Sequence, residues 1–273
     1  MSNSGPVVLI TGGGKGIGRE TALEFLRKGY KVTICGRDSE ALEKAKLRFT
    51  TEGFETLAVA GDVTIIEDCR RIVDQTIQNF GRLDCLVNNA GMAMRGSFAE
   101  TTEKVYRDLI AINYLGAVYM TKVALPALLQ TGGSVVFISS LAGFFGLPQV
   151  SGYSASKMAL TALAQSLQGE FRHRLHVGIL YVSFTENDQN KTVYRADGSL
   201  GSLVRGKNSS TQSQVAKAVY TMVRFHRRRK VIRVLGFFAD GAFRYFPGLV
   251  GFVLRTFGKN STVGGSIRNS SSK

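Results

Sequence analysis

Tyr153 and Lys157 are four residues apart, and this spacing places both side chains on one face of a helix, one turn from each other. A free phenol has a pKa of about 10, which is too high for efficient acid or base catalysis near neutrality. A lysine ammonium one turn away favours the phenolate and so lowers that pKa. The pair therefore indicates a general acid and base that exchanges a proton with a carbonyl or alcohol oxygen.

Ser140 could supply the third group of this site. It closely follows the apolar run at residues 134–138, which is typical of a buried strand, and a short linker leads from it to Tyr153. Its hydroxyl can hold the substrate oxygen and stabilise the negative charge that develops there. The alternative for Tyr153 and Lys157 taken alone is an ordinary solvated helix face, and the N-terminal segment argues against it.

A glycine-rich turn follows the first apolar run, at residues 7–10, and precedes a helical pattern over residues 19–28. A second strand over residues 31–35 completes the strand, turn, helix and strand that a dinucleotide fingerprint requires. Glycines let the backbone approach a pyrophosphate, whose charge meets the helix N-terminus. The alternative is an ordinary strand-to-helix turn. The residues expected to bind the cofactor here are Gly12, Gly14, Lys15, Gly16, Ile17 and Gly18.

Arg37 ends the second strand, where an NAD site usually has an acidic residue for the ribose 2′-hydroxyl. An arginine at this point suits a 2′-phosphate instead, and Lys15 adds a second cation nearby. Asp38 comes one position later, where we expect it to cap the next helix. The sequence therefore predicts NADP(H) as the cofactor.

These motifs, their spacing and the Asn-Asn-Ala-Gly run at residues 88–91 together resemble the short-chain dehydrogenase/reductase family over residues 7 to about 185. Lys15 and Arg37 are similar to the NADP-preferring branch. The resemblance implies a carbonyl or alcohol substrate, a homodimer or homotetramer, and a catalytic set that also includes Asn113. In this set, Asn113 would kink its helix and hold a water that links Lys157 to solvent. The alternative is that Asn113 is an ordinary buried asparagine whose amide groups have all their hydrogen-bond partners.

Further cofactor contacts are implied by the same resemblance. Lys157 would also bind the nicotinamide ribose, with Tyr153 beside it. Relatives have a Pro-Gly pair after the strand at residues 175–182, whereas this chain has Ser183 and Phe184. The other residues implied to contact the cofactor are Asp62, Val63, Asn89, Ala90, Gly91 and Thr185.

The element pattern predicts a single doubly wound α/β domain of the Rossmann type, with a mainly parallel sheet of seven strands and helices on both faces. We expect this domain to cover residues 1–235, with the last strand over residues 230–235. Residues 186–210 lack periodicity and are interpreted as a substrate loop, either a functional lid or partly disordered. Residues 236–273 would form an aromatic and basic tail that is partly disordered.

The charge of the chain is concentrated at its end. Residues 191–273 hold 16 Lys and Arg against 2 Asp and Glu, within a formal net charge of +15. Cations beside the aromatic stretch at residues 236–258 suit contact with an anionic membrane surface, and the alternative is packing on the body or on a partner subunit. No nucleic-acid-binding module is recognisable. The start of the chain predicts no secretory signal, so we expect a cytoplasmic protein. Peripheral association with a membrane is the alternative location.

Overall fold

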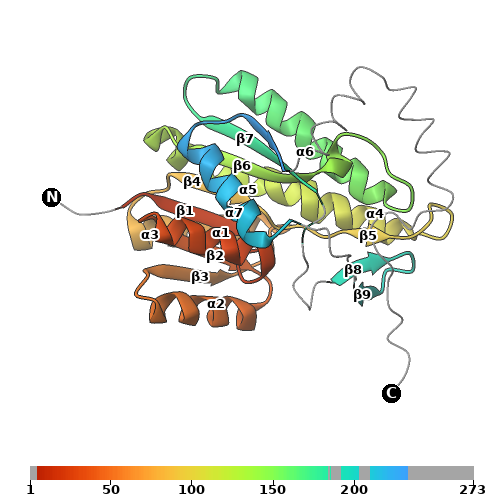
Figure 1. Ribbon diagram of the computed structural model, residues 1–273, viewed down its shortest axis with the longest axis horizontal. Helices are drawn as coiled ribbons and strands as arrows, with labels where there is room; N and C mark the ends of the chain where they lie inside the picture. Colours follow the sequence, from red (N-terminus) through yellow and green to blue (C-terminus); the bar gives the residue numbers. More distant parts are fainter. Residues whose placement is uncertain (1–4, 184, 186–191, 203–209, 233–273) are drawn as a thin grey trace.

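The computed structural model describes residues 5–183, 185, 192–202 and 210–232. Seven parallel strands form its main sheet, in the order β10-β7-β6-β4-β1-β2-β3 (Figure 1). This confirms the predicted doubly wound α/β fold, while the aromatic stretch at residues 236–258 lies outside the described residues. The strands of the main sheet are β1 (Val7–Thr11), β2 (Lys31–Gly36), β3 (Thr56–Ala60), β4 (Cys85–Asn88), β6 (Ser134–Ser140), β7 (His176–Val182) and β10 (Arg229–Val231).

Helices cover both faces of this sheet, and β1 explains why. Val7 and Leu9 point into one core, whereas Val8 and Ile10 point into the other, and none of the four has any exposed surface. Successive strand residues face opposite sides of a sheet, so a strand buried on both sides is apolar throughout. The first core is covered by α3 (Ile66–Phe80), α5 (Gly116–Thr131) and α6 (Ser151–Glu170), and the second by α1 (Gly16–Arg27), α2 (Ser39–Thr51) and α7 (Gln212–Arg224).

The strand order places the ligand-binding crevice. From β1 the chain winds outward through β2 and β3, and it then returns to β4 on the other side of β1 and winds the opposite way. Ligands of open α/β sheets bind outside the carboxyl ends of the strands at such a reversal. The glycine loop follows β1 and the Asn-Asn-Ala-Gly run follows β4, so both meet at this point.

A second sheet was not predicted. Two short strands, β8 (Thr192–Arg195) and β9 (Leu200–Ser202), form an antiparallel hairpin, and β8 pairs in parallel with β5 (Met94–Arg95). Figure 1 shows this hairpin apart from the main sheet, beside β5 and α4 (Glu103–Ile110). The described part of the expected substrate loop is therefore ordered as a strand pair on the segment that follows β4.

The long helix predicted over residues 103–125 has two helical parts that are joined by a π-helical segment, Ala111–Leu115. It also continues to Thr131 through Pro126. The stretch Glu103–Thr131 is long and apolar enough to cross a membrane by length and composition alone. Because its residues Met120, Ala124 and Leu128 have no exposed surface and pack on the sheet, we interpret it as a core helix.

Candidate active site

Lys157 is held against the carboxyl end of β6 by hydrogen bonds in both directions. Its ammonium Nζ donates to the Ile138 carbonyl at 2.9 Å, and its own carbonyl accepts from Ser139 Oγ at 3.3 Å. One turn further along α6, Thr161 Oγ1 donates to the Gly143 carbonyl at 3.2 Å. The lysine is only 5% exposed. These contacts fix the α6 face that carries Tyr153 and Lys157 beside the strand that ends in Ser140.

Tyr153 lies one turn before Lys157 on this face. The Lys157 ammonium is 5.8 Å from the centre of the Tyr153 ring. The ring is half-buried against a cluster of apolar residues, and a second tyrosine joins the same cluster. The members of this cluster besides Tyr153 are Met92, Met94, Val105, Leu109 and Tyr194.

The two serines at the end of β6 have different environments. Ser139 is 3% exposed and its hydroxyl is used within the core, whereas Ser140 is half-buried on the open side. Ser140 Oγ accepts a hydrogen bond from the Ala142 amide at 3.3 Å. Since a hydroxyl both accepts and donates, Ser140 can still donate to a substrate oxygen. Of the two, Ser140 is therefore the candidate for substrate contact.

Asn113 is fully satisfied by protein groups. Its side-chain nitrogen donates to the Met92 carbonyl and to Ser156 Oγ, both at 2.9 Å, and its oxygen accepts from the Met92 amide at 2.8 Å. The residue lies in the π-helical segment of this helix. The Asn113 side chain thus links the segment after β4 to α6 by hydrogen bonds. Its role in a proton relay stays a prediction.

Gly91 lies between the Asn113 side chain and the Lys157 ammonium. A Cβ atom at Gly91 would lie 2.9 Å from Asn113 Oδ1 and 3.4 Å from Lys157 Nζ. Lys157, Asn113 and the end of the Asn-Asn-Ala-Gly run therefore meet at one point. A side chain at position 91 would intrude between them.

The glycine loop is bound directly to the end of β4. The amide side chain of Asn89 donates to the carbonyls of Thr11 at 2.9 Å and Gly12 at 3.2 Å. The backbone amides of Asn89 and Ala90 both donate to Thr11 Oγ1, at 3.0 and 2.9 Å. Asn89 thus holds the loop with its side chain. Thr11 was not among the expected site residues, although its position just before Gly12 is a signal that could have identified it.

Gly18 and Gly12 are in contact within this loop. Gly12 has φ +65° and Gly16 has φ +54°, a backbone conformation that glycine adopts without strain. A Cβ atom at Gly18 would lie 2.1 Å from the Gly12 carbonyl oxygen. A Cβ atom at Gly14 would lie 3.2 Å from the backbone of Ala41 at the start of α2. A side chain at Gly18 would therefore clash within the loop, and Ile17 at the start of α1 packs against the second core.

Two cations mark the rim of the crevice beside β2. Lys15 forms an ion pair with Asp38 at 2.6 Å, and Asp38 also caps α2 as expected, because its Oδ1 accepts from the Ala41 amide at 2.9 Å. The neighbouring Lys15 side chain lowers the pKa of Asp38. Arg37 is 58% exposed and lies 3.8 Å from Asp62.

Asp62 and Val63 follow β3 and have different surroundings. Asp62 Oδ1 accepts hydrogen bonds from the amide and the hydroxyl of Thr64, at 2.9 and 2.8 Å, so this aspartate also caps the turn into α3. The Val63 side chain is 7% exposed and packs close to Gly116. Only the backbone of Val63 is thus available for a cofactor contact.

Thr185 lies beyond the end of β7. It is 4% exposed, its hydroxyl donates to the Ser183 carbonyl at 3.2 Å, and its backbone pairs with that of Ser210. Phe184 lies outside the described residues. Thr185 is three positions beyond Val182, which is opposite Ser140 in the register of the sheet.

A family model described as short chain dehydrogenase matches residues 6–197. The chain belongs to the short-chain dehydrogenase family. The matched segment contains the glycine loop, the run after β4, Ser140, Tyr153 and Lys157, and it ends within the β8–β9 hairpin.

Curated relatives of this short-chain dehydrogenase include "11-beta-hydroxysteroid dehydrogenase-like 4A" of Arabidopsis thaliana, which is 39% identical over 188 residues. That alignment covers 67% of this chain and 62% of the relative, so the chain spans less than two thirds of the relative's length. "Dehydrogenase/reductase SDR family protein 7-like" of Dictyostelium discoideum is 32% identical over 262 residues, with coverage of 93% and 82%. Among solved structures, a short-chain dehydrogenase from Streptomyces avermitilis is 25% identical with a TM-score of 0.78, covering 94% of this chain and 97% of its own.

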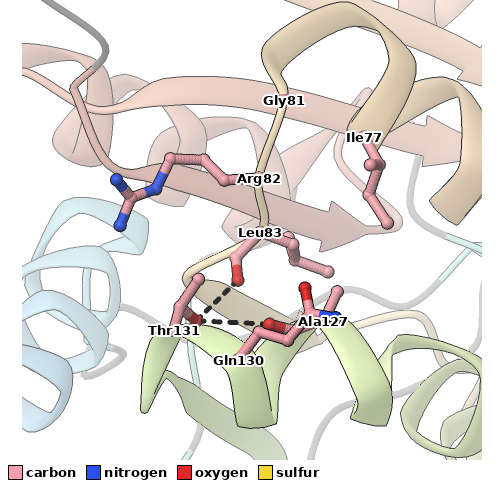
Figure 2. A pocket seen from close by; sticks show the side chains of 7 residues that line it. All are labelled: Ile77, Gly81, Arg82, Leu83, Ala127, Gln130 and Thr131. Atoms are coloured by element: carbon pink, nitrogen blue, oxygen red, sulfur yellow. Dashed lines mark hydrogen bonds between the residues drawn. The ribbon is translucent and has the colours of Figure 1, made fainter.

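One cavity of about 450 Å³ lies away from this site (Figure 2). It is bounded by the ends of α3 and α5 and by Arg82 and Leu83, which precede β4, so it lies at the opposite edge of the sheet. Arg82 is paired with Asp84 at 2.6 Å, and Thr131 Oγ1 donates to the Leu83 carbonyl at 2.9 Å. Arg82 thus has its partner outside the lining and Thr131 has one within it, and the cavity lies apart from the crevice at the carboxyl ends of the strands.

Proposed function

We propose that this short-chain dehydrogenase transfers hydride between NADP(H) and a lipophilic ketone or secondary alcohol. The observation that carries the proposal is the environment of Tyr153. This phenol lies at the carboxyl edge of the sheet, one turn from a buried ammonium and beside the strand end that presents Ser140. The loop that contains Gly12 and Gly18 fits a dinucleotide. These positions have no side chains, so a pyrophosphate can approach the main chain closely.

Each catalytic residue then has one task. The nicotinamide, when bound, supplies the hydride in reduction and accepts it in oxidation. Tyr153 donates its phenolic proton to the carbonyl oxygen in reduction and takes it back in oxidation. Lys157 favours the phenolate through its positive charge, and Ser140 donates a hydrogen bond to the substrate oxygen. Asn113 keeps the π-helical segment and the run after β4 in register, and we assign it the link from Lys157 to solvent.

The choice of NADP(H) rests on Arg37 and Lys15. Asp38, the nearest acid to the end of β2, is already paired with Lys15 and with the α2 amide, so it is a poor partner for a ribose hydroxyl. Arg37 is exposed, and its contact with Asp62 is long at 3.8 Å. The Arg37 side chain can therefore turn toward a 2′-phosphate and give up only this weak interaction with Asp62.

Replacing Arg37 with Asp should reverse the cofactor preference. Loss of charge-assisted hydrogen bonds to the phosphate is expected to weaken NADPH binding roughly tenfold to a hundredfold, while NADH binding improves or stays the same. Titration of both nucleotides by their own fluorescence measures this. Arg70→Asp is the matched control, since Arg70 is 61% exposed on α3 and should leave both affinities unchanged. Equal binding of both cofactors by the wild type would contradict the assignment.

The apolar residues around Tyr153 support a lipophilic substrate. Met92 and Tyr194 are half-buried beside Tyr153, with Met94 at 2% exposure in the cluster beneath them, so an adaptable thioether and an aromatic face border the tyrosine. Burial and the nearby Asp108 charge raise the pKa of Tyr194, so this second phenol stays neutral and does not compete with Tyr153 as a base. The names of the Arabidopsis relatives agree with a steroid-like substrate, and a 3-keto long-chain lipid is the alternative within the same class.

A ketone panel tests the substrate class. NADPH oxidation should be fastest with sterol-like or long-chain ketones and slow with small polar ketones or sugars. A different preference would remove the lipophilic assignment. No turnover with any ketone or alcohol would instead favour a catalytically idle nucleotide-binding scaffold.

The location and assembly of the protein complete the proposal. We assign it to the cytoplasm as a homodimer or homotetramer, in contact with anionic membrane through residues 224–233 and the aromatic stretch at residues 236–258. Residues 224–230 are described, and they hold five Lys and Arg side chains with Phe225, which is 66% exposed. Cations beside exposed aromatic surface suit an interfacial contact.

Vesicle flotation tests the membrane contact. The full chain should float with anionic vesicles and not with neutral ones, and added salt should release it because the attraction is screened. Replacing Arg224, Arg227 and Arg228 with Glu should abolish flotation and leave NADPH binding unchanged. A full chain that stays in the soluble fraction with anionic vesicles would remove the idea.

A further inference from the structure

Three loops at the amino edge of the main sheet carry an excess of positive charge. They follow α1, α6 and α7, at residues 28–30, 171–175 and 225–228, and each leads into a strand of the sheet. None of the three contains Asp or Glu, and Glu170, one position before the second loop, is the acid nearest to them in the sequence. We call their exposed cations, with those of the helix ends before them, the basic face: Arg27, Lys28, Arg172, Arg174, Arg224, Arg227 and Arg228.

Direct contacts join the loops after α6 and α7 into one surface. Gln168, in the last turn of α6, donates from Nε2 to the Arg228 carbonyl at 2.9 Å. His176, the first residue of β7, has its Nε2 atom 3.1 Å from the Arg227 carbonyl. The end of α1 lies on the other flank of α7, where the Lys28 ammonium is 5.6 Å from the centre of an α7 tyrosine ring. The cations of the three loops therefore share one face of the protein.

The charge of the basic face exceeds what the helix ends need. A helix C-terminus has a partial negative charge that one cation, such as Arg27 or Arg224, can balance. Within the described ranges no carboxylate forms an ion pair with a cation of the basic face, whereas several exposed cations of α2, α3 and α4 have one. Burial and the Arg227 charge also lower the pKa of the adjoining Lys230. Like charges thus repel one another here, and a negatively charged surface would relieve that repulsion.

Phe225 places an apolar ring among these cations. It is 66% exposed, and the Arg227 guanidinium lies 6.0 Å from the centre of its ring. Cationic and aromatic side chains together suit the interface of an anionic bilayer, where phosphates meet the cations and the ring enters the headgroup boundary. A nucleic acid is the other polyanion that could meet such charge, but the chain has no recognisable module for it. The basic face therefore favours a lipid surface.

The basic face and the catalytic crevice lie at opposite edges of the sheet. The crevice lies at the carboxyl ends of the strands, and β7 alone has seven residues, so roughly 20 Å separate the two edges. Figure 1 shows the C-terminal ends of α6 and α7 on the side of the sheet away from the β8–β9 hairpin. A bilayer against the basic face would leave the crevice open to water, in which NADP(H) is dissolved.

We propose that the protein lies on anionic membrane by this amino edge, with Phe225 in the interface and the crevice facing the aqueous phase. Arg172 and Arg174 contact lipid headgroups together with the cations of the loop after α7. This inference rests on the proposed membrane contact, to which it adds the loop after α6 and an orientation.

Tryptophan fluorescence tests the orientation, because the chain has no tryptophan of its own. In the full chain, Phe225→Trp should shift its emission to the blue when phosphatidylcholine vesicles that contain phosphatidylserine are added, and brominated lipid should quench it. Phe98→Trp is the control at the other edge, since Phe98 is 77% exposed between β5 and α4, and its emission should not change. A shift at position 98, or none at position 225, would overturn the proposal.

Charge reversal tests the loop after α6. Arg172→Glu combined with Arg174→Glu should weaken binding to the same vesicles roughly thirtyfold or more, because two cations are lost from the contact. Lys44→Glu combined with Arg70→Glu changes the net charge equally at exposed positions on α2 and α3, and it should weaken binding less than about threefold. Both double variants should bind NADPH as the wild type does. Equal vesicle affinities of the two double variants would show that the loop after α6 makes no contact, against the proposal.

Wild-type flotation separates this inference from the proposed function. If the full chain does not bind anionic vesicles, the membrane contact itself is wrong, and the orientation with it. If it binds and position 98 responds, the contact stands and the orientation alone is wrong. Binding to duplex DNA, with no response of Phe225→Trp to vesicles, would assign the basic face to nucleic acid and overturn the proposal.

Discussion

Replacing Tyr153 with Phe should lower the rate of NADPH-dependent ketone reduction by roughly a thousandfold or more, within the usual range for loss of a general acid. The change removes one hydroxyl and keeps the ring, which packs against Met94, Val105 and Leu109. NADPH binding should therefore stay close to that of the wild type. Steady-state rates with the best ketone of the panel and nucleotide titration measure the two effects separately.

Tyr220→Phe provides the matched control for this prediction. It makes the same chemical change on α7, where the Tyr220 ring packs edge to face with Phe25 against the second core, while α6 covers the first core. Its turnover should be close to that of the wild type. If the Tyr153 variant kept its turnover, another group would have to supply the proton, and the assignment of Tyr153 would be wrong.

Local patterns explain what the sequence predicted correctly. The glycine loop lies between β1 and α1, and Tyr153 and Lys157 lie one turn apart on α6, so short spacings determined both. The parallel sheet with helices on both faces followed from alternating strands and helices, since parallel strands need a helical crossover. The structure confirmed these elements with shifts of a few residues at their ends, such as β10 at Arg229–Val231.

Pairing between distant segments explains what the sequence missed. The hairpin of β8 and β9 joins β5, a strand of two residues about a hundred positions earlier, and strands this short show no alternation. The contacts of Asn89 with Thr11 and Gly12 depend on β4 lying directly beside β1, which is a consequence of the winding reversal.

Replacing Gly18 with Ala should disrupt the cofactor site more than the same replacement at any other glycine of the loop. The new Cβ atom would lie 2.1 Å from the Gly12 carbonyl oxygen, which is backbone, and 2.7 Å from Asn89 Nδ2, which is held by hydrogen bonds to the Thr11 and Gly12 carbonyls. The loop would have to open and release Asn89. We expect an unfolding free energy lower by about 1–3 kcal/mol and a loss of NADPH affinity of at least a hundredfold, because overpacked sites force the backbone to shift.

Gly169→Ala is the control that separates this effect from helix propensity. Gly169 also lies in a helix, α6, but a Cβ atom there would meet nothing within 4 Å. Alanine should therefore stabilise the protein by up to about 1 kcal/mol. Urea unfolding and NADPH titration measure both variants. If the Gly18 variant matched the Gly169 variant in both, the glycine loop would not be the tight cradle that positions the pyrophosphate against the N-terminus of α1.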